Sequence, residues 1–124
     1  MKKRILIVED DLPLLNVLSA KVKELNYVVV EAIDGKQAIR KFKKESPDLV
    51  LLDIILPLKN GFEVLKEIKM KQKSKIPVLI LSNLGEPEDI EKGKKLGAIG
   101  FITKSNFTLK EIMTQLNKAI KKNE

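Results

Sequence analysis

Three carboxylates stand directly after short apolar runs in this chain, where they could form a site. Glu9 and Asp10 follow Ile5–Val8, and Asp53 follows Leu49–Leu52. Carboxylates that share a crevice repel one another and raise one another's pKa, and a hard cation relieves that repulsion. Mg²⁺ prefers a few carboxylates and keeps some of its water, so these residues predict a Mg²⁺ site, with Mn²⁺ as the alternative ion.

A hydroxyl and a lysine complete the group. Ser82 follows the apolar run Val78–Leu81, and Lys104 comes two residues after Ile99–Ile102. Together with a bound divalent cation, Lys104 would suit a dianionic phosphoryl group, whose transfer depends mainly on positioning and on neutralising spread charge. The chain contains no Cys and no His, which excludes thiolate metal sites, His-based zinc sites and Ser-His catalysis.

Five short apolar runs alternate with helical patterns and must position these groups. The runs are Ile5–Val8, Tyr27–Val30, Leu49–Leu52, Val78–Leu81 and Ile99–Ile102. Because they are continuously apolar rather than alternating, they predict strands buried on both faces of a parallel sheet. Ligands of such sheets bind at the carboxyl ends of the strands, so residues that follow different strands are expected to meet there.

Helix start signals stand between these runs. They are Asp11 with Pro13, Asp34 with Gln37, Asn60 with Glu63, Pro87, and Thr108 with Glu111. A side-chain oxygen at the first position accepts a backbone N–H of the first turn, and proline is tolerated in that turn because the missing N–H has no helical partner there. Gly97 is expected to end the fourth helix as its C-cap.

The balance of charge is basic but dispersed. There are 24 Lys and Arg residues against 17 Asp and Glu residues, a net charge of +7, with four Phe, one Tyr and no Trp. The denser run Lys69, Lys71, Lys73 and Lys75 is expected to be a solvated helix face or loop. A nucleic-acid-binding module is a lesser alternative that no recognition-helix motif supports.

No apolar run approaches the ~20 residues of a membrane span, so a cytoplasmic protein is expected.

Four segments carry the candidate site in order along the chain. They are Ile7–Asp11, Leu51–Asp53 with Pro57 and Gly61, Leu81–Ser82, and Phe101–Lys104. On these segments the whole chain resembles a response-regulator receiver domain, the phosphoacceptor domain of two-component signalling. The resemblance implies one receiver domain over residues 1–124. It also implies an α/β fold: a flavodoxin-like, doubly wound five-stranded parallel sheet of strand order 2-1-3-4-5, with five helices on both faces.

The resemblance also implies a role for each site residue. Asp53 would take a phosphoryl group from a phosphohistidine of a sensor kinase or phosphotransfer protein. The ligands of Mg²⁺ would be Glu9, Asp10, Asp53 and the backbone carbonyl of Ile55. Lys104 would contact the oxygens of the acyl phosphate. Such a domain catalyses its own phosphorylation and dephosphorylation but turns over no metabolite.

A switch is implied as well. Ser82 would bond to a phosphoryl oxygen and Phe101 would turn inward, which would change the surface of the fourth helix, the fifth strand and the fifth helix. A downstream protein or a second copy of the chain would bind that surface. The alternatives are that Phe101 is an ordinary core residue, that Ser82 is a turn hydroxyl, and that the domain is an adaptor that needs no phosphate.

The sequence departs from the family at four positions near the site. Ser105 replaces the usual proline after Lys104, and because a cis bond before a residue other than proline costs ~3 kcal/mol, a trans Lys104–Ser105 bond is expected. Asn83 replaces a small residue and could crowd the phosphoryl group. Ile55 and Leu84 are apolar where the family has polar side chains that orient the attacking water. Slow self-dephosphorylation is therefore expected.

Overall fold

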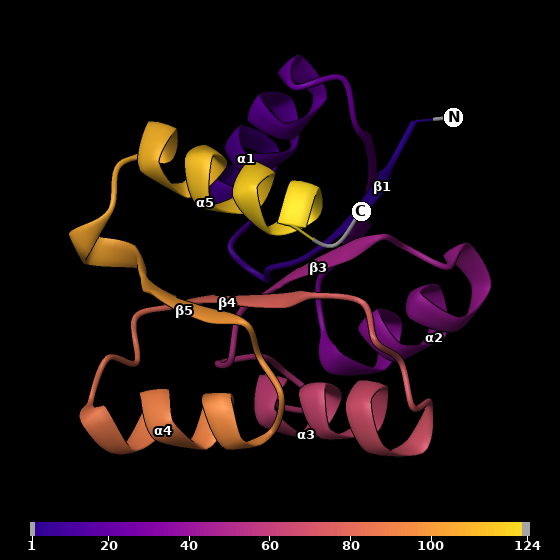
Figure 1. Ribbon diagram of the computed structural model, residues 1–124, viewed down its shortest axis with the longest axis vertical. Helices are drawn as coiled ribbons and strands as arrows, with labels where there is room; N and C mark the ends of the chain where they lie inside the picture. Colours follow the sequence, from indigo (N-terminus) through magenta and orange to yellow (C-terminus); the bar gives the residue numbers. More distant parts are fainter. Residues whose placement is uncertain (1, 123–124) are drawn as a thin grey trace.

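The computed structural model describes residues 2–122 and contains a five-stranded, fully parallel sheet of order β2-β1-β3-β4-β5 (Figure 1). The strands are β1 (Arg4–Val8), β2 (Val28–Ala32), β3 (Leu49–Leu52), β4 (Val78–Ser82) and β5 (Gly100–Thr103). Parallel neighbours need crossover connections, and a helix lies between each pair of strands consecutive in the chain. The predicted strand order is confirmed.

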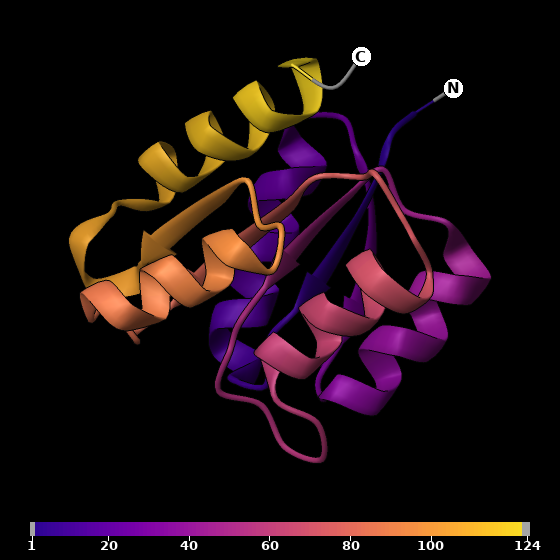
Figure 2. The same ribbon diagram turned by 60° about the horizontal axis from the view of Figure 1, so that its bottom comes forward.

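Helices cover both faces of this sheet. They are α1 (Leu12–Glu24), α2 (Gly35–Glu45), α3 (Gly61–Lys66), α4 (Pro87–Lys95) and α5 (Leu109–Lys122). In Figure 1, α1 and α5 lie on one side of the strands and α2, α3 and α4 on the other, and Figure 2 gives the same division from a second direction. The doubly wound, flavodoxin-like class predicted from the sequence is confirmed.

The alternation of side chains along the strands divides the core in two. Ile5 and Ile7 of β1 belong to the cluster with α1 and α5, whereas Leu6 and Val8 belong to the cluster with α2 and α3. The strands β3 and β4 alternate in the same way. Because every one of these residues is apolar, β1, β3 and β4 are buried on both faces, as the continuous apolar runs predict.

The predicted helix caps form. Asp11 accepts the N–H of Leu14 at 3.2 Å. At the start of α5, Thr108 and Glu111 make the full capping box: each side chain accepts the backbone N–H of the other residue, at 2.9 and 3.1 Å. Gly97 lies just beyond α4 with a φ of 102°, and its N–H bonds to the carbonyl of Lys94 at 3.0 Å.

The predicted bounds match for β3 alone; β1 begins one residue earlier, β4 ends one residue later, and both ends of β2 and β5 differ from the prediction. β2 begins at Val28 and continues through Glu31 to Ala32, although the apolar run in the sequence stops at the charged Glu31. Glu31 fits within the strand because its carboxylate accepts the hydroxyl hydrogen of buried Ser19 at 2.5 Å. β5 begins one residue later than predicted, since Ile99 is 55% exposed and Gly100 is the first residue to pair with β4.

The lysine run at the end of the third helix is only partly solvated. The helix continues from α3 into a π-helical turn, η1 (Glu67–Lys71). Lys71, Lys73 and Lys75 are exposed as expected, but the ammonium group of Lys69 donates to the backbone carbonyls of Ser74, at 3.4 Å, and Ile76. Burial lowers the pKa of Lys69. One member of the run is therefore a partly buried anchor for the segment that leads into β4.

Candidate functional site

Backbone pairing at the carboxyl end of the sheet fixes two of the carboxylates. The N–H of Glu9 bonds to the carbonyl of Ala32, and the N–H of Asp53 to the carbonyl of Val8, both at 3.0 Å. These bonds extend the strand ladders by one residue beyond β1 and β3. Glu9 and Asp53 are consequently almost fully buried, at 2% and 4% exposure. Asp10, at the turn into α1, is exposed.

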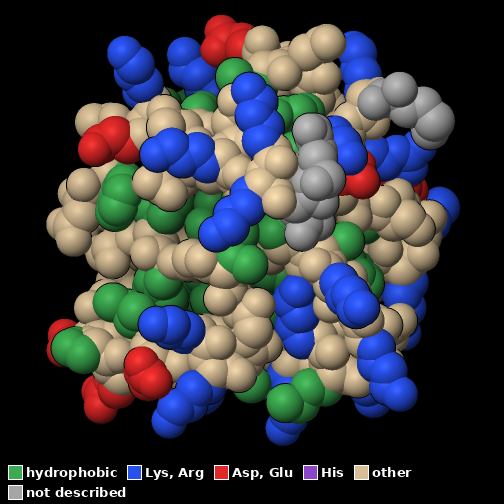
Figure 3. All heavy atoms as spheres, in the orientation of Figure 1, with side chains coloured by type: hydrophobic (Ala, Val, Ile, Leu, Met, Phe, Trp, Pro, Cys, Tyr) green, Lys and Arg blue, Asp and Glu red, His purple; other side chains and the backbone are tan. Residues whose placement is uncertain are grey.

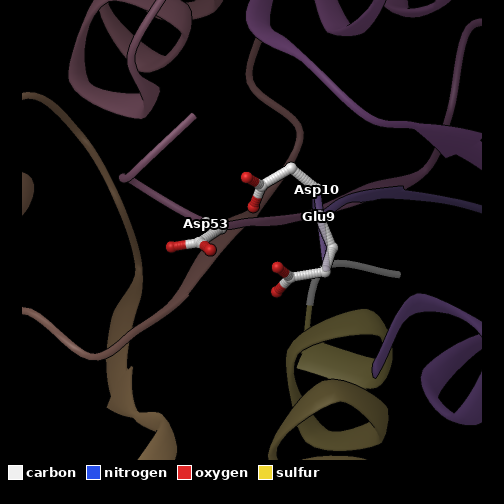
Figure 4. Close-up of side chains that lie close together, drawn as sticks. All are labelled: Glu9, Asp10 and Asp53. Carbon is white, nitrogen blue, oxygen red and sulfur yellow. The ribbon is translucent and has the colours of Figure 1, made fainter. Parts of the chain in front are cut away.

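The three predicted acidic residues come together at this end of the sheet. Glu9, Asp10 and Asp53 each place a carboxylate oxygen within 4.8 Å of the others. Figure 4 shows their side chains converging from the ends of β1 and β3. Two of the three are buried, where like charges repel strongly, so the cluster needs positive charge from another source.

Lys104 supplies one positive charge. Its ammonium group lies 2.7 Å from Oε1 of Glu9 and 2.9 Å from Oδ2 of Asp53. The lysine begins a short 3-10 turn, η2 (Lys104–Asn106), directly after β5, and its side chain is only 17% exposed. The sequence predicts Lys104 at this site, but its contact with Glu9 was missed, because no pattern in the sequence indicates which carboxylate a lysine will reach.

Burial and charge shift two pKa values in the site. Burial raises the pKa of Glu9, and the negative charge of Asp53 raises it further, while the hydrogen bond from Lys104 opposes both effects. Burial alone would lower the pKa of Lys104, but its bonds to Glu9 and Asp53 outweigh that effect and raise it above the ordinary lysine value. The site therefore holds Lys104 in its charged form.

The remaining carboxylate contact orients Asp53. Its Oδ1 accepts the backbone N–H of Ile55 at 3.3 Å, while Oδ2 accepts from Lys104. Each oxygen of the carboxylate is thus held by a different partner. Ile55 itself is 57% exposed.

Ser82 and Phe101 lie on the neighbouring strands β4 and β5. Ser82 is the last residue of β4 and is fully buried, and its hydroxyl oxygen accepts the N–H of Leu84 at 3.4 Å. Phe101 is half-buried and packs on the α4 side of the sheet, next to Gly93. In this structure Phe101 is thus part of the core, in contact with the helix that its predicted movement would affect.

The structure shows where the four residues that depart from the expected family pattern lie. The Lys104–Ser105 peptide bond is trans, as predicted. Asn83 is exposed. Leu84 packs with the core on the α4 side. Neither Ile55 nor Leu84 presents a polar group to the site.

Residues 5–117 match the family described as the response regulator receiver domain. This match covers most of the chain, and it includes every residue of the acidic cluster together with Lys104. The chain belongs to this receiver family. It is accordingly a receiver domain of two-component signalling, as the four sequence segments indicated.

Relatives and solved structures agree on this assignment. The receiver is 34% identical over 124 residues to the alkaline phosphatase synthesis transcriptional regulatory protein PhoP of Bacillus subtilis, matching 100% of this chain and 51% of that protein. The receiver domain of Francisella response regulator 1452 superimposes with a TM-score of 0.91 at 28% identity, over 99% of this chain and 100% of that one. The non-phosphorylated HemR receiver domain of Leptospira biflexa gives 0.89 at 36% identity, over 96% and 94%.

The receiver spans about half the length of the curated relatives it matches. What those longer proteins do as a whole is therefore a separate question from the chemistry of this site. Among residues 2–122, no helix is both long and apolar enough to cross a membrane.

The donor set of this receiver suits a divalent cation. The carboxylates of Glu9, Asp10 and Asp53 carry three negative charges when ionised, and the ammonium group of Lys104 brings the formal charge of these four groups to −2. All the donors are hard oxygen atoms, and no sulfur or imidazole is present. The acidic cluster is therefore of the type that binds Mg²⁺.

Proposed function

We propose that Asp53 accepts a phosphoryl group from a phosphohistidine of a sensor kinase or phosphotransfer protein, with Mg²⁺ bound beside it. The observation that carries this proposal is the position of the Asp53 carboxylate, which is buried, held at both oxygens and in contact with Lys104. A buried carboxylate in a site of formal charge −2 is suited to accept a phosphoryl group once a divalent cation has neutralised that charge.

In the proposed transfer, the bond between phosphorus and the histidine nitrogen breaks and a bond between phosphorus and an Asp53 oxygen forms. Lys104 has to exchange part of its contact with Asp53 for a contact with a phosphoryl oxygen, while its 2.7 Å contact with Glu9 keeps it in place. An ammonium group positioned in this way stabilises the charge of the transferring group.

Glu9, Asp10 and Asp53 are the proposed side-chain ligands of Mg²⁺, and the backbone carbonyl of Ile55 is the proposed fourth protein ligand. When bound, the ion supplies Lewis-acid stabilisation of phosphoryl oxygens. Asp10 is the exposed member of the cluster, so it is suited to capture the ion from solvent. Glu9 is buried and is held in place by Lys104.

The proposed response to phosphorylation passes through β4 and β5. The buried hydroxyl of Ser82 lies at the end of β4 and would bond to a phosphoryl oxygen. Ser82 pairs with Thr103 of β5, two residues from Phe101, which contacts α4. A shift of Ser82 would therefore be felt by Phe101 and by the surface that α4, β5 and α5 share.

The phosphorylated state is proposed to be long-lived. Hydrolysis of the acyl phosphate requires an oriented water molecule, and neither Ile55 nor Leu84 offers a polar side chain to hold one. We also propose that residues 1–124 act as one receiver domain in the cytoplasm, where a sensor kinase could reach it.

Intact mass after incubation with acetyl phosphate tests the proposal. Wild-type protein with Mg²⁺ is expected to gain one phosphoryl group, and neither the wild type without Mg²⁺ nor Asp53→Asn is expected to gain any. A folded wild-type protein that gains no phosphoryl group under any condition would overturn the proposal in favour of a phosphate-independent adaptor.

A further inference from the structure

The loop between β3 and α3, residues 54–60, carries the carbonyl of Ile55, the proposed fourth protein ligand of Mg²⁺. At its end, the N–H of Gly61 bonds to the carbonyl of Ile54 at 2.7 Å. A Cβ atom on Gly61 would come within 2.3 Å of the backbone oxygen of Asp53, so α3 begins directly against the backbone of that residue. Because Ile55 also donates its N–H to the carboxylate of Asp53, a displacement of the loop would reach the proposed phosphoacceptor.

The middle of this loop has a strained backbone. Leu58 has a φ of 68°, in the left-handed region that a leucine rarely adopts. The N–H of Lys59 bonds to the carbonyl of Pro57 at 2.8 Å, which closes a γ-turn of the strained kind around Leu58. Leu58 is 71% exposed, so burial of its side chain does not hold the turn. A strained conformation persists only where its surroundings hold it, so contacts of the neighbouring residues have to do so.

Lys59 supplies such a contact through its side chain. Its ammonium group lies 3.0 Å from Oε1 of Glu67, whose side chain is only 12% exposed. Glu67 is the first residue of η1, directly after α3. Its other carboxylate oxygen lies 3.9 Å from the ammonium group of Lys43 on α2. One carboxylate therefore connects the loop, α2 and the end of α3.

The backbone of the loop also lies directly against α2. A Cβ atom on Gly35, the first residue of α2, would come within 1.9 Å of the carbonyl oxygen of Lys59. Gly35 also donates its N–H to the carbonyl of Pro57 at 3.2 Å. These contacts hold the loop to α2, and the pair of Lys59 with Glu67 connects it to the end of α3 as well.

The surroundings favour a charged Glu67. The hydrogen bond from Lys59 is the main cause that lowers the pKa of Glu67, while burial opposes it, so the carboxylate is ionised at neutral pH. In Figure 3, lysine and arginine side chains gather over α2 and α3, at the lower right. Within residues 2–122, Glu67 is the one carboxylate that forms ion pairs with two lysines. Since its side chain is largely withdrawn from solvent, this pair is screened less than an exposed one.

We propose that Glu67, acting through Lys59, is a positioning residue for the Mg²⁺ site, because the pair holds the loop that carries the Ile55 carbonyl and thereby sets the affinity for the ion. This inference rests on the proposed function, in which that carbonyl is a ligand. Without the pair, the turn around Leu58 is free to relax. The loop then has to be ordered again when the ion binds, and that ordering lowers the affinity.

The sign of one substitution separates positioning from simple charge. Lys59→Met removes a positive charge from the protein, and by electrostatics alone it would tighten the binding of a cation. If the lysine positions the loop, the same substitution weakens binding. We expect the dissociation constant for Mg²⁺ to rise by about tenfold, as is usual when residues that support metal ligands are lost. Titration of unphosphorylated protein with magnesium chloride, followed by calorimetry and by amide shifts in NMR spectra, measures it. Glu67→Gln should weaken binding to a similar extent.

Lys43→Met is the matched control. It removes the other lysine that pairs with Glu67 and changes the net charge equally, but Lys43 lies on α2, is 54% exposed and is not part of the loop. We expect its affinity for Mg²⁺ to stay within about twofold of the wild-type value. None of the three substituted side chains belongs to the apolar core, so a folded NMR spectrum is expected for each variant.

Several results would overturn the inference. One is a Lys59→Met variant that binds Mg²⁺ as tightly as the wild type or more tightly, and another is equal weakening by Lys43→Met. A wild-type protein that binds no Mg²⁺ would overturn the inference together with the proposed function. Wild-type protein that binds Mg²⁺ and gains a phosphoryl group on Asp53, while Lys59→Met keeps full affinity, would remove only the positioning role and leave the proposed phosphorylation intact.

Discussion

Lysines serve two regions of this molecule in opposite ways. At the carboxyl end of the sheet, Lys104 is 17% exposed and contacts two carboxylates within 2.9 Å. On α4 and α5, Lys94, Lys118 and Lys122 are exposed, and none makes an ion pair within the described part of the chain. A buried ammonium group must be compensated inside the fold, whereas an exposed one is compensated by water.

Two isoleucines repeat this contrast. Ile55 beside the acidic cluster is 57% exposed, and Ile99 directly before β5 is 55% exposed. Nearly equal exposure therefore accompanies two different situations: Ile55 is proposed to leave the attacking water without a partner, whereas Ile99 lies at the opposite end of β5 from Lys104 and has no proposed role in the reaction. Location relative to Asp53, and not exposure, distinguishes the two residues. Matched substitutions in the two regions can test each distinction.

The largest expected effect concerns the rate of phosphorylation. Lys104→Met removes the positive charge beside Asp53, and we expect phosphorylation by acetyl phosphate to slow by about 100-fold or more, the usual cost of losing one charge-stabilising donor. Lys118→Met removes an equal charge from the surface of α5 and should leave the rate unchanged. The rate of adduct formation in Mg²⁺, followed by intact mass, measures both. Equal phosphorylation rates in the two variants would contradict the proposal that Lys104, and not Lys118, assists phosphoryl transfer.

A smaller effect is expected on the lifetime of the phosphorylated protein. Ile55→Asn combined with Leu84→Glu supplies polar groups that can orient water, and we expect decay of the acyl phosphate to accelerate by about tenfold. Ile99→Asn, at a similarly exposed isoleucine before β5, is the control and should not change the decay rate. The phosphorylated fraction after removal of the donor gives the rate. An unaltered rate in the double variant would contradict the explanation from water orientation.

The next effect concerns stability and its dependence on pH. Lys104→Met leaves Glu9 and Asp53 without their cation and is expected to lower the free energy of unfolding by about 1–3 kcal/mol in the absence of Mg²⁺. Because the pKa of Lys104 is raised above 10.5, its stabilising effect is fully present below that pH and is lost as the pH rises through the folded-state pKa. Urea denaturation of wild type and variant, from neutral pH to beyond 10.5, measures the difference. A difference that stays constant over this range would contradict the account.

The smallest effect is expected on the surface of α5. Lys118→Met should change the free energy of unfolding by less than about 0.5 kcal/mol, because the lysine is exposed and makes no ion pair among the described residues. Urea denaturation at neutral pH, beside Lys104→Met, gives the value. A loss as large as that of Lys104→Met would mean that Lys118 has a structural role.

The sequence predicts the acidic cluster well because strand ends in a parallel sheet must meet. Asp53 follows four apolar residues that predict a buried strand, and Glu9 and Asp10 follow another such run. The strand order follows from the family resemblance. By contrast, the extension of β2 through Glu31 depends on the hydroxyl of Ser19, which is on another element and has no local signal.

Contacts of long side chains are the part that the sequence does not specify. Lys69 belongs to a lysine run whose other members are exposed, yet its ammonium group donates to the carbonyl of Ile76, seven residues further along the chain. Lys104 reaches both Glu9 and Asp53, whereas the sequence predicted only that it lies at the site and would contact the oxygens of an acyl phosphate. A lysine side chain has four rotatable carbon–carbon bonds, so tertiary packing, not local pattern, decides where its ammonium group lies.

The most direct test of the account is to locate the phosphoryl group on the chain. Protein labelled with acetyl phosphate in Mg²⁺ is treated with borohydride, which reduces an aspartyl phosphate to homoserine, and the peptides are sequenced by mass spectrometry. Homoserine is expected in place of Asp53 and at no other position. Homoserine at Asp10, or a phosphoryl group that survives borohydride on a hydroxyl such as that of Ser82, would contradict the assignment of Asp53 as phosphoacceptor.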